Sequence, residues 1–281
     1  LNPMCLGEME YIPFPGNLEK LLNGELPEMN DILLSPDTDI LSMMIKGFMP
    51  ALLDFDAQNV MLQWWDGYVR TYLERDLRQI TQIESLPDFR RVMTSLALRS
   101  GQILNQTAVS RELGLSQPTV HRYINLLETS YMVERLPAFS VNRNKRLSKS
   151  PKVVWNDPAL ACFLSGYHKP DDLRESTIAG GVFESLVYMH LNAEIQLMTP
   201  MPRLYFWRTS TGKEVDFVIE RGRSLVAIEV KLSGQVRYVD LENLKIFMEE
   251  YPETVSSIVV YTGSEIKRMD ENIFAVPWYL L

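Results

Sequence analysis

Large apolar residues in the first part of the chain recur at steps of three and four. Trp64, Tyr68 and Tyr72 follow this spacing within residues 37–82, which is typical of amphipathic helices. Pro50 bends or breaks that helical stretch. A further helix is expected over 86–100, where Gly101 follows. The pattern therefore predicts a helical region before residue 101.

After about residue 157 the apolar pattern changes. Runs of strand length now alternate with helical stretches, in an order that is typical of an α/β unit. The predicted order is a helix over 180–196, strands over 203–209, 213–220 and 224–232, a helix over 238–250 and a strand over 256–262.

Between these regions lies a pattern of two short helices and two strands. The first helix begins at Asn105 or Gln106, and Gly114 permits a tight turn after it. Ser116 can cap a second helix that runs to Thr129 and carries a proline in its first turn. A strand over 131–139, a basic loop and a returning strand over 153–157 follow. This pattern predicts a winged helix-turn-helix.

The 281 residues suffice for two hydrophobic cores. Residues 1–36, which are rich in Pro, Gly and Asn, read as an irregular connector with one short helix at 18–22. Residues 37–157 form the helical region with the winged helix-turn-helix, and 158–281 the α/β domain. We thus expect a mixed α+β or α/β chain.

The net charge of −8 is unevenly distributed. Residues 70–152 hold fourteen Lys and Arg against seven Asp and Glu, while the flanking regions are acidic. Local charge determines where a polyanion docks, so the basic middle third favours a nucleic-acid partner. The two cysteines form no zinc or disulfide pattern. No apolar run is long enough for a membrane helix and no signal peptide opens the chain, so a cytoplasmic protein is expected.

Two sets of residues are candidates for DNA contact. The first residues of the second short helix should meet base edges in the major groove: Gln117, Thr119, His121 and Arg122. The basic loop should contact phosphates through Arg143, Lys145, Arg146 and Lys149, together with Arg135 and Lys152. Such helices also serve in dimerisation or between domains, and basic hairpins are often only solvated. Both interpretations remain open from the sequence.

Charged residues interrupt the two apolar strands between Gly212 and Ser233. A two-residue loop at Arg221-Gly222 would place Asp216 opposite Ala227. Because strand side chains alternate between faces, one face then carries Glu214, Asp216, Glu229 and Lys231. Asp216 and Glu229 become diagonal neighbours, roughly 7–8 Å apart. Two carboxylates at that separation can share one hard cation, so we expect Mg²⁺, which Mn²⁺ could replace.

An aspartate strand followed by a strand with Glu-x-Lys resembles the motif of PD-(D/E)XK nucleases, which have a restriction-endonuclease-like fold. The resemblance implies Asp216, Glu229 and Lys231 as catalytic residues, and a further acid on the preceding helix, which matches Glu184. Asp216, Glu229 and Glu184 would be the metal ligands. The proline of the family name is loosely kept in such proteins, and here Val215 precedes Asp216. The alternative is a buried ion-pair network without catalysis, since fold does not imply function.

Five ordered segments across residues 60–281 resemble the C-terminal part of prokaryotic AAA-type ATPases that carry a domain of unknown function. They begin with YVRTYLERDLRQI and SGQILNQTAVSRELGLSQPTVHRYINLLETSYMVERLPAF. NRNKRLSKSPKVVWNDPALACFL, GGVFESLVYMHL and LYFWRTSTGKEVDFVIERG…LVAIEVKLS follow. In such proteins a nucleotide-binding domain precedes these segments, and LNPMCLGEME resembles its end. No G-x-x-x-x-G-K-[ST] loop occurs here, so neither ATP binding nor ATPase activity is expected of this chain.

The sequence therefore favours a DNA-associated C-terminal region of an AAA-type ATPase with a Mg²⁺-dependent nuclease site. The expected partners are double-stranded or branched DNA, the missing ATPase domain and a possible second copy of the chain, with no membrane. Two alternatives remain. One is a non-catalytic DNA- or protein-binding module that regulates the ATPase, and the other is a purely structural interaction domain, which would leave the basic loop unexplained.

Overall fold

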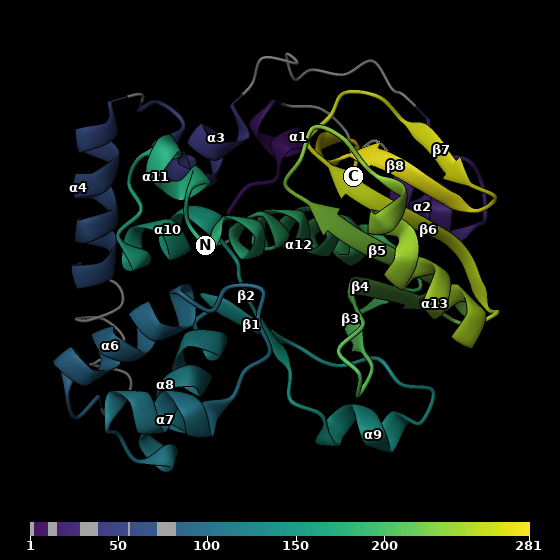
Figure 1. Ribbon diagram of the computed structural model, residues 1–281. Coiled ribbons are helices and arrows are strands. Elements are labelled where there is room, and N and C mark those ends of the chain that lie inside the picture. The colour runs from purple at the N-terminus through teal and green to yellow at the C-terminus, as the bar shows by residue number, and fades with distance from the viewer. Residues whose placement is uncertain (1–2, 11–15, 29–38, 56, 72–82) are drawn as a thin grey trace. The chain divides into compact units, whose positions relative to one another are not determined.

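The structure is a computed structural model that describes residues 3–10, 16–28, 39–55, 57–71 and 83–281 (Figure 1). The chain forms two compact units, and neither is a single continuous segment. Unit 1 comprises Leu1–Met4, Leu41–Arg135 and Val153–Leu186. Unit 2 comprises Cys5–Ile40, Leu136–Lys152 and Val187–Leu281.

Unit 1 is mainly helical, as the apolar spacing predicted. Its core is built around α6 (Leu86–Ala97), which packs against α7 (Gln106–Leu113), α8 (Gln117–Thr129) and α10 (Pro158–Ser165). Helix α10 in turn packs against α4 (Gln58–Tyr68). Phe89, Val92 and Leu96 line the fully buried face of α6. The sequence also spaces Glu74 and Arg78 for an i,i+4 pair, and both residues lie outside the described part of the chain. The other helices are α3 (Ile40–Lys46), η1 (Pro50–Leu52) and α11 (Pro170–Arg174).

The two short helices at the centre of the chain form as predicted. Helix α7 (Gln106–Leu113) ends at Gly114, whose φ of 65° is left-handed and therefore suits glycine. Helix α8 (Gln117–Thr129) begins after Ser116, whose side chain accepts a hydrogen bond from the amide of Thr119. The apolar face of α8 is buried at Val120, Tyr123, Ile124 and Leu127.

The basic segment that follows differs from the prediction. Strands β1 (Val133–Leu136) and β2 (Lys152–Trp155) form a two-stranded sheet, but the segment between them contains a helix, α9 (Arg143–Ser148). The side chain of Asn142 caps α9 by accepting a hydrogen bond from the amide of Asn144. The expectation of an open basic loop between two strands is therefore wrong.

Unit 2 contains a six-stranded mixed sheet in the order β3-β4-β5-β6-β8-β7. Parallel pairing joins β5 to β6 and β6 to β8, while the other neighbours are antiparallel. The strands are β3 (Arg203–Arg208), β4 (Glu214–Arg221), β5 (Ser224–Lys231), β6 (Thr254–Tyr261), β7 (Lys267–Asp270) and β8 (Ile273–Pro277). The first four match predicted strands, whereas β7 and β8 were not predicted.

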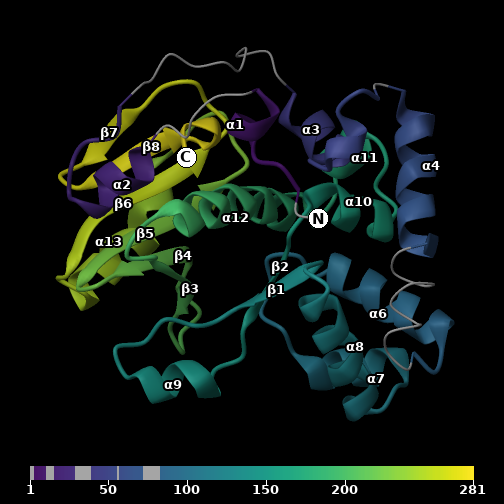
Figure 2. The ribbon, with the colours of Figure 1, turned by 180° about the vertical axis from the view of Figure 1, so that it is seen from behind.

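Helices cover both faces of this sheet (Figures 1 and 2). Helix α13 (Glu242–Glu250), which follows η3 (Tyr238–Leu241), packs on β4 and β5. Helix α2 (Asn17–Leu22) packs on β5 and β6 from the opposite face. On that second face Tyr188 of α12 (Ala179–Leu197) also lies against Phe217. The shorter helices are α1 (Leu6–Met9) and η4 (Trp278–Leu280). In the described part of the chain, no helix is long and apolar enough to cross a membrane.

The register of the β4–β5 hairpin differs from the prediction by two residues. Arg221 pairs with Ser224 and Val218 with Ala227, so the two-residue turn is Gly222-Arg223. Gly222 has a φ of 64°, as a two-residue hairpin with glycine at its first central position requires. The predicted loop would have placed Arg221 there instead. A shift of two preserves the faces of the strands, and one further step of this register puts Asp216 opposite Glu229.

Candidate active site

Asp216 lies near the start of β4 and is 8% exposed. Its Oδ1 accepts a hydrogen bond from Lys152 Nζ at 2.9 Å, and its Oδ2 accepts one from the backbone amide of Val230 at 2.9 Å. Both oxygens of this buried carboxylate therefore have donors, as buried charge requires. These contacts hold Asp216 against β5.

Glu229 lies on β5 and is 6% exposed. Its Oε1 lies 2.6 Å from Lys231 Nζ, whereas its buried Oε2 has no hydrogen-bond partner among the described residues. Burial, followed by the nearby charge of Asp216, raises the pKa of Glu229 to about 8. The Asp216–Glu229 pair thus resembles the close carboxylate pairs that share a proton or a cation.

Lys231 extends from the same face of β5 and is one-third exposed. Burial alone would lower the pKa of its ammonium, but the charges of Glu229, Asp216 and Asp240 outweigh burial and raise it. Lys231 therefore stays protonated beside the carboxylates, at a position from which solvent is accessible. Asp216, Glu229 and Lys231 come together in unit 2 as the sequence predicted.

Lys152 is a further member of this cluster. The sequence pattern predicted that Lys152 lies in the basic loop and contacts phosphate, but its side chain is 1% exposed. Its Nζ lies 2.9 Å from Asp216 Oδ1 and 2.9 Å from Glu214 Oε1, so that expectation is wrong. Lys152 directly precedes the buried run Val153–Trp155. A charged residue adjoining an apolar strand was the signal that could have identified it.

The oxygens of Asp216 and Glu229 suit a hard divalent cation, which prefers carboxylate ligands. The strongest indication is Glu229 Oε2, which is buried and has no donor in the described part of unit 2. Across the described ranges, no three His, Cys, Asp or Glu side chains gather in a way that could hold a metal ion. A cation at this pair would therefore need water or substrate oxygens as its remaining ligands.

Glu184, the fourth predicted catalytic residue, belongs to unit 1. It lies in the first half of α12, where its Oε2 would be 2.9 Å from a Cβ placed on Gly101. The neighbouring Ser185 donates or accepts a hydrogen bond with Ser100 at 2.9 Å and accepts one from the amide of Trp155. Packing within unit 1 fixes this turn of the helix, and the role of Glu184 stays a prediction.

The basic residues of the 143–149 segment fall into two classes. Arg143, Lys145 and Lys149 are exposed. Arg146 is 8% exposed and forms two hydrogen bonds with the carboxylate of Glu220, at 2.7 and 2.8 Å. Its guanidinium also lies over the rings of Phe139 and Tyr205. The charge of Arg146 is thus paired with Glu220 inside unit 2.

The predicted base-contacting residues lie on the exposed side of α8. Gln117, His121 and Arg122 are exposed, and Thr119 is half-buried. Gln117 Nε2 donates to the hydroxyl of Thr107 on α7, and Arg122 Nη1 donates to Glu84 at 2.9 Å.

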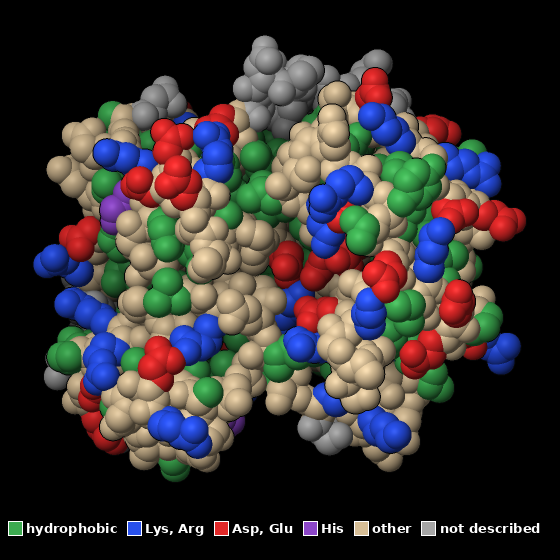
Figure 3. All heavy atoms as spheres, in the orientation of Figure 1, with side chains coloured by type: hydrophobic (Ala, Val, Ile, Leu, Met, Phe, Trp, Pro, Cys, Tyr) green, Lys and Arg blue, Asp and Glu red, His purple; other side chains and the backbone are tan. Residues whose placement is uncertain are grey.

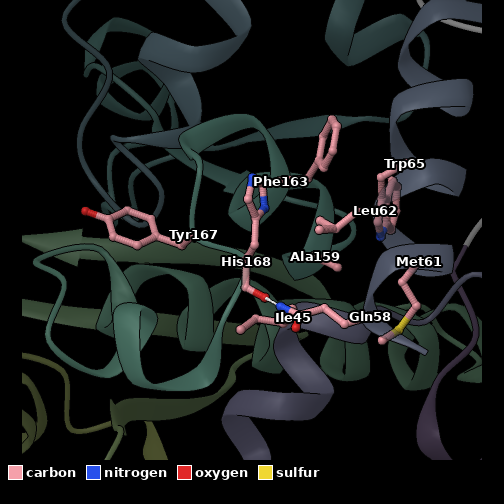
Figure 4. A pocket seen from close by; sticks show the side chains of 9 residues that line it. All are labelled: Ile45, Gln58, Met61, Leu62, Trp65, Ala159, Phe163, Tyr167 and His168. Carbon is pink, nitrogen blue, oxygen red and sulfur yellow. Dashed lines mark hydrogen bonds between the residues drawn. The ribbon is translucent and has the colours of Figure 1, made fainter. Parts of the chain in front are cut away.

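A separate hollow in unit 1 does not involve the acidic cluster (Figure 4). It leaves only about 10 Å³ for the centre of a water molecule, so it is far too small for an ordinary ligand. The amide of Gln58 donates to the backbone carbonyl of His168 at its edge. Its lining is mostly apolar: Ile45, Gln58, Met61, Leu62, Trp65, Ala159, Phe163, Tyr167 and His168. The acidic cluster is therefore the better candidate for chemistry.

Two uncharacterized mycobacterial proteins are similar to this chain: Mb2031c of Mycobacterium bovis and Rv2008c of Mycobacterium tuberculosis. Each is 29% identical over 241 residues, which cover 83% of this chain and 51% of the relative. The chain therefore spans about half the length of these curated relatives. No solved structure matches the chain. Residues 37–171 match a domain of unknown function, DUF8612, and residues 179–281 match a second, DUF4143.

By these comparisons the chain consists mainly of a region similar to DUF8612 followed by a region similar to DUF4143.

Proposed function

We propose that this chain is a DNA-associated region of an AAA-type ATPase and carries a PD-(D/E)XK-type phosphodiesterase site at Asp216, Glu229 and Lys231. The observation that supports this best is the buried carboxylate pair Asp216–Glu229, with one acceptor oxygen left over, beside a lysine that reaches solvent. An acid pair and a lysine on one face of the β4–β5 hairpin provide the oxygen ligands and the fixed positive charge that phosphodiester hydrolysis uses.

Each residue would have a distinct role in this reaction. Asp216 and Glu229 would hold a Mg²⁺ ion, which lowers the pKa of a bound water and polarises a phosphodiester when present. Lys231 would orient the attacking water or neutralise charge on the phosphate, since its ammonium is held on the same face by Glu229.

The DNA-binding part of the proposal treats α7 and α8, together with β1 and β2, as a winged helix-turn-helix. The exposed start of α8 presents Gln117 and Arg122, whose side chains can pair with adenine and guanine edges. Basic and acidic side chains are interspersed on the face drawn in Figure 3. Binding would therefore depend on a local group of cations rather than on a surface of one sign, and it should weaken with salt.

A cleavage assay tests the enzymatic proposal. The chain is incubated with branched, single- and double-stranded DNA and Mg²⁺ or Mn²⁺, beside Asp216→Ala and Lys231→Ala. Either variant should lose at least about 100-fold in rate. Lys213→Ala is a matched control, because this half-buried lysine pairs with Glu242 outside the cluster, at 2.5 Å. Cleavage by the wild type that both cluster variants retain would reject the site.

Lys152 favours a second candidate, a non-catalytic module that binds DNA or a partner protein for the ATPase. Its ammonium already neutralises Asp216 and Glu214, as in a closed ion-pair network. Salt-sensitive DNA binding without cleavage would favour this module. If binding is also absent, and charge reversal at Arg143 and Lys145 changes nothing, the chain is better interpreted as an interaction domain.

A further inference from the structure

We infer that Lys152 is a built-in cation of the acidic cluster and takes the position that a second divalent ion would occupy between Asp216 and Glu214. The cluster would then accept at most one divalent ion, at the Glu229 side. This inference uses the proposed function only for the class of ligand, a hard divalent cation. Lys152 is here a positioning residue, because its contacts are with carboxylates of the protein.

The burial of Lys152 is the first support. Its side chain is 1% exposed, and a buried ammonium is stable only when carboxylates surround it. Lys152 Nζ lies 2.9 Å from both Asp216 and Glu214. These two acids are two positions apart on β4 and therefore lie on the same face of the strand. A bridging cation between two carboxylates is the arrangement that a metal ion would otherwise create.

The charge balance of the cluster is the second support. Three acidic side chains, those of Glu214, Asp216 and Glu229, face three cations, so the cluster carries no net negative charge even with Glu229 ionised. The cations are Lys152, Lys231 and Arg208, which lies 3.0 Å from Glu214. A divalent ion gains little attraction from a balanced cluster, whereas removal of one buried cation leaves an excess negative charge. Lys152 should therefore weaken divalent binding and limit its stoichiometry.

The arrangement of the remaining acceptors is the third support. Both oxygens of Asp216 already have donors, from Lys152 and from the amide of Val230. Glu229 Oε2 is the buried carboxylate oxygen of the described cluster that has no hydrogen-bond partner. One acceptor oxygen of this kind can anchor one ion. A second ion would have to displace Lys152.

The test compares the full chain with Lys152→Met, Lys152→Arg and a control, Arg146→Met, by thermal unfolding in EDTA and in millimolar MnCl₂. Lys152→Met should melt about 5–15 °C lower in EDTA, because it leaves buried carboxylates without their cation. Mn²⁺ should restore most of that loss. The control also breaks a buried ion pair in unit 2. Among the described residues Glu220 is the one carboxylate that pairs with Arg146, so Mn²⁺ should not restore the stability of this variant.

Mn²⁺ binding measured by electron paramagnetic resonance completes the test. The wild type should bind at most one Mn²⁺ ion per chain at the cluster, which is the binding that Asp216→Asn abolishes. Lys152→Met should bind Mn²⁺ at least about tenfold more tightly than the wild type does. Lys152→Arg should behave like the wild type. Two cluster-bound ions in the wild type would overturn the inference even if Lys152→Met does not fold.

The outcomes for Lys152 and for the nuclease proposal are separable. Unchanged Mn²⁺ affinity in a folded Lys152→Met variant rejects the built-in cation, whether or not the wild type cleaves DNA. Manganese rescue of Lys152→Met in a protein that never cleaves DNA supports the built-in cation and rejects the nuclease.

Discussion

The first turn of α12 passes so close to Ser100 that a Cβ on Gly181 would lie 1.9 Å from the Ser100 carbonyl oxygen. Gly180, the preceding residue, has no atom within 4 Å of the corresponding position. We expect Gly181→Ala to destabilise the protein by about 1–3 kcal/mol or more, because backbone must move to admit the methyl group. Gly180→Ala should be neutral or slightly stabilising. Urea unfolding of the two variants checks this, and equal midpoints would contradict it.

Glu194 predicts a pH-dependent stability. It is 4% exposed, and burial, followed by the charge of Glu19, raises its pKa to about 7. An acid whose pKa is raised in the folded state binds more protons there than when unfolded, so stability falls as pH rises from about 4.5 to 7. The loss attributable to Glu194 should reach about 3 kcal/mol at pH 8.

Glu194→Gln should remove this dependence. At pH 8 the variant should be more stable than the wild type by about 1–3 kcal/mol, while at pH 5 the two should be similar. Denaturant unfolding from pH 5 to 8.5 measures the difference, with the exposed Glu249→Gln as the control. A pH-independent difference between Glu194→Gln and the wild type would show that charge burial is not its cause.

Arg146 should be sensitive even to conservative replacement. Its guanidinium bonds both oxygens of Glu220 and the hydroxyl of Tyr205, the last at 2.7 Å. A lysine ammonium cannot form this fork, so Arg146→Lys should destabilise unit 2 by about 1–3 kcal/mol. The melting temperatures of Arg146→Lys and of the exposed Arg143→Lys provide the comparison. Similar melting temperatures for both variants would contradict a structural role for Arg146.

The ion pair between Arg122 and Glu84 predicts how DNA binding could be strengthened. Hydrogen bonding to Arg122 lowers the pKa of Glu84, so this acid remains charged near the start of α8. Glu84→Gln should free Arg122 and raise DNA affinity a few-fold, whereas Arg122→Ala should reduce affinity and lower the salt slope by about one. Fluorescence anisotropy at several salt concentrations measures both. An effect of Glu84→Gln that persists in Arg122→Ala would exclude this explanation.

The sequence allowed the strand faces of the β4–β5 hairpin to be predicted, but not its register. Alternation with a period of two placed Asp216, Glu229 and Lys231 together regardless of the turn. The register depends on whether Gly222 is the first or the second residue of the two-residue turn. Gly222 lies between two arginines, so the sequence permits either turn.

Other features depended on tertiary contacts that no local pattern contains. Helix α9 is held by Arg146, whose partner Glu220 is 74 residues away, and the basic composition of this segment suggested an exposed loop. Lys152 likewise pairs with Asp216 across 64 residues. Strand β7 is polar and mostly exposed at the sheet edge, so it has no apolar alternation to detect.

The division of the chain between Lys152 and Val153 has a practical consequence for expression. A fragment that begins at residue 179, as the DUF4143 match does, omits Lys152 and with it the cation that Asp216 contacts. It also omits the segment 137–139 that hydrogen-bonds along β3, and helix α2, which covers β5 and β6. Such a fragment should expose a strand edge and an apolar sheet face, and therefore aggregate. Sequence-match limits are poor guides to autonomous folding here, because the required residues arrive from three separate stretches of the chain.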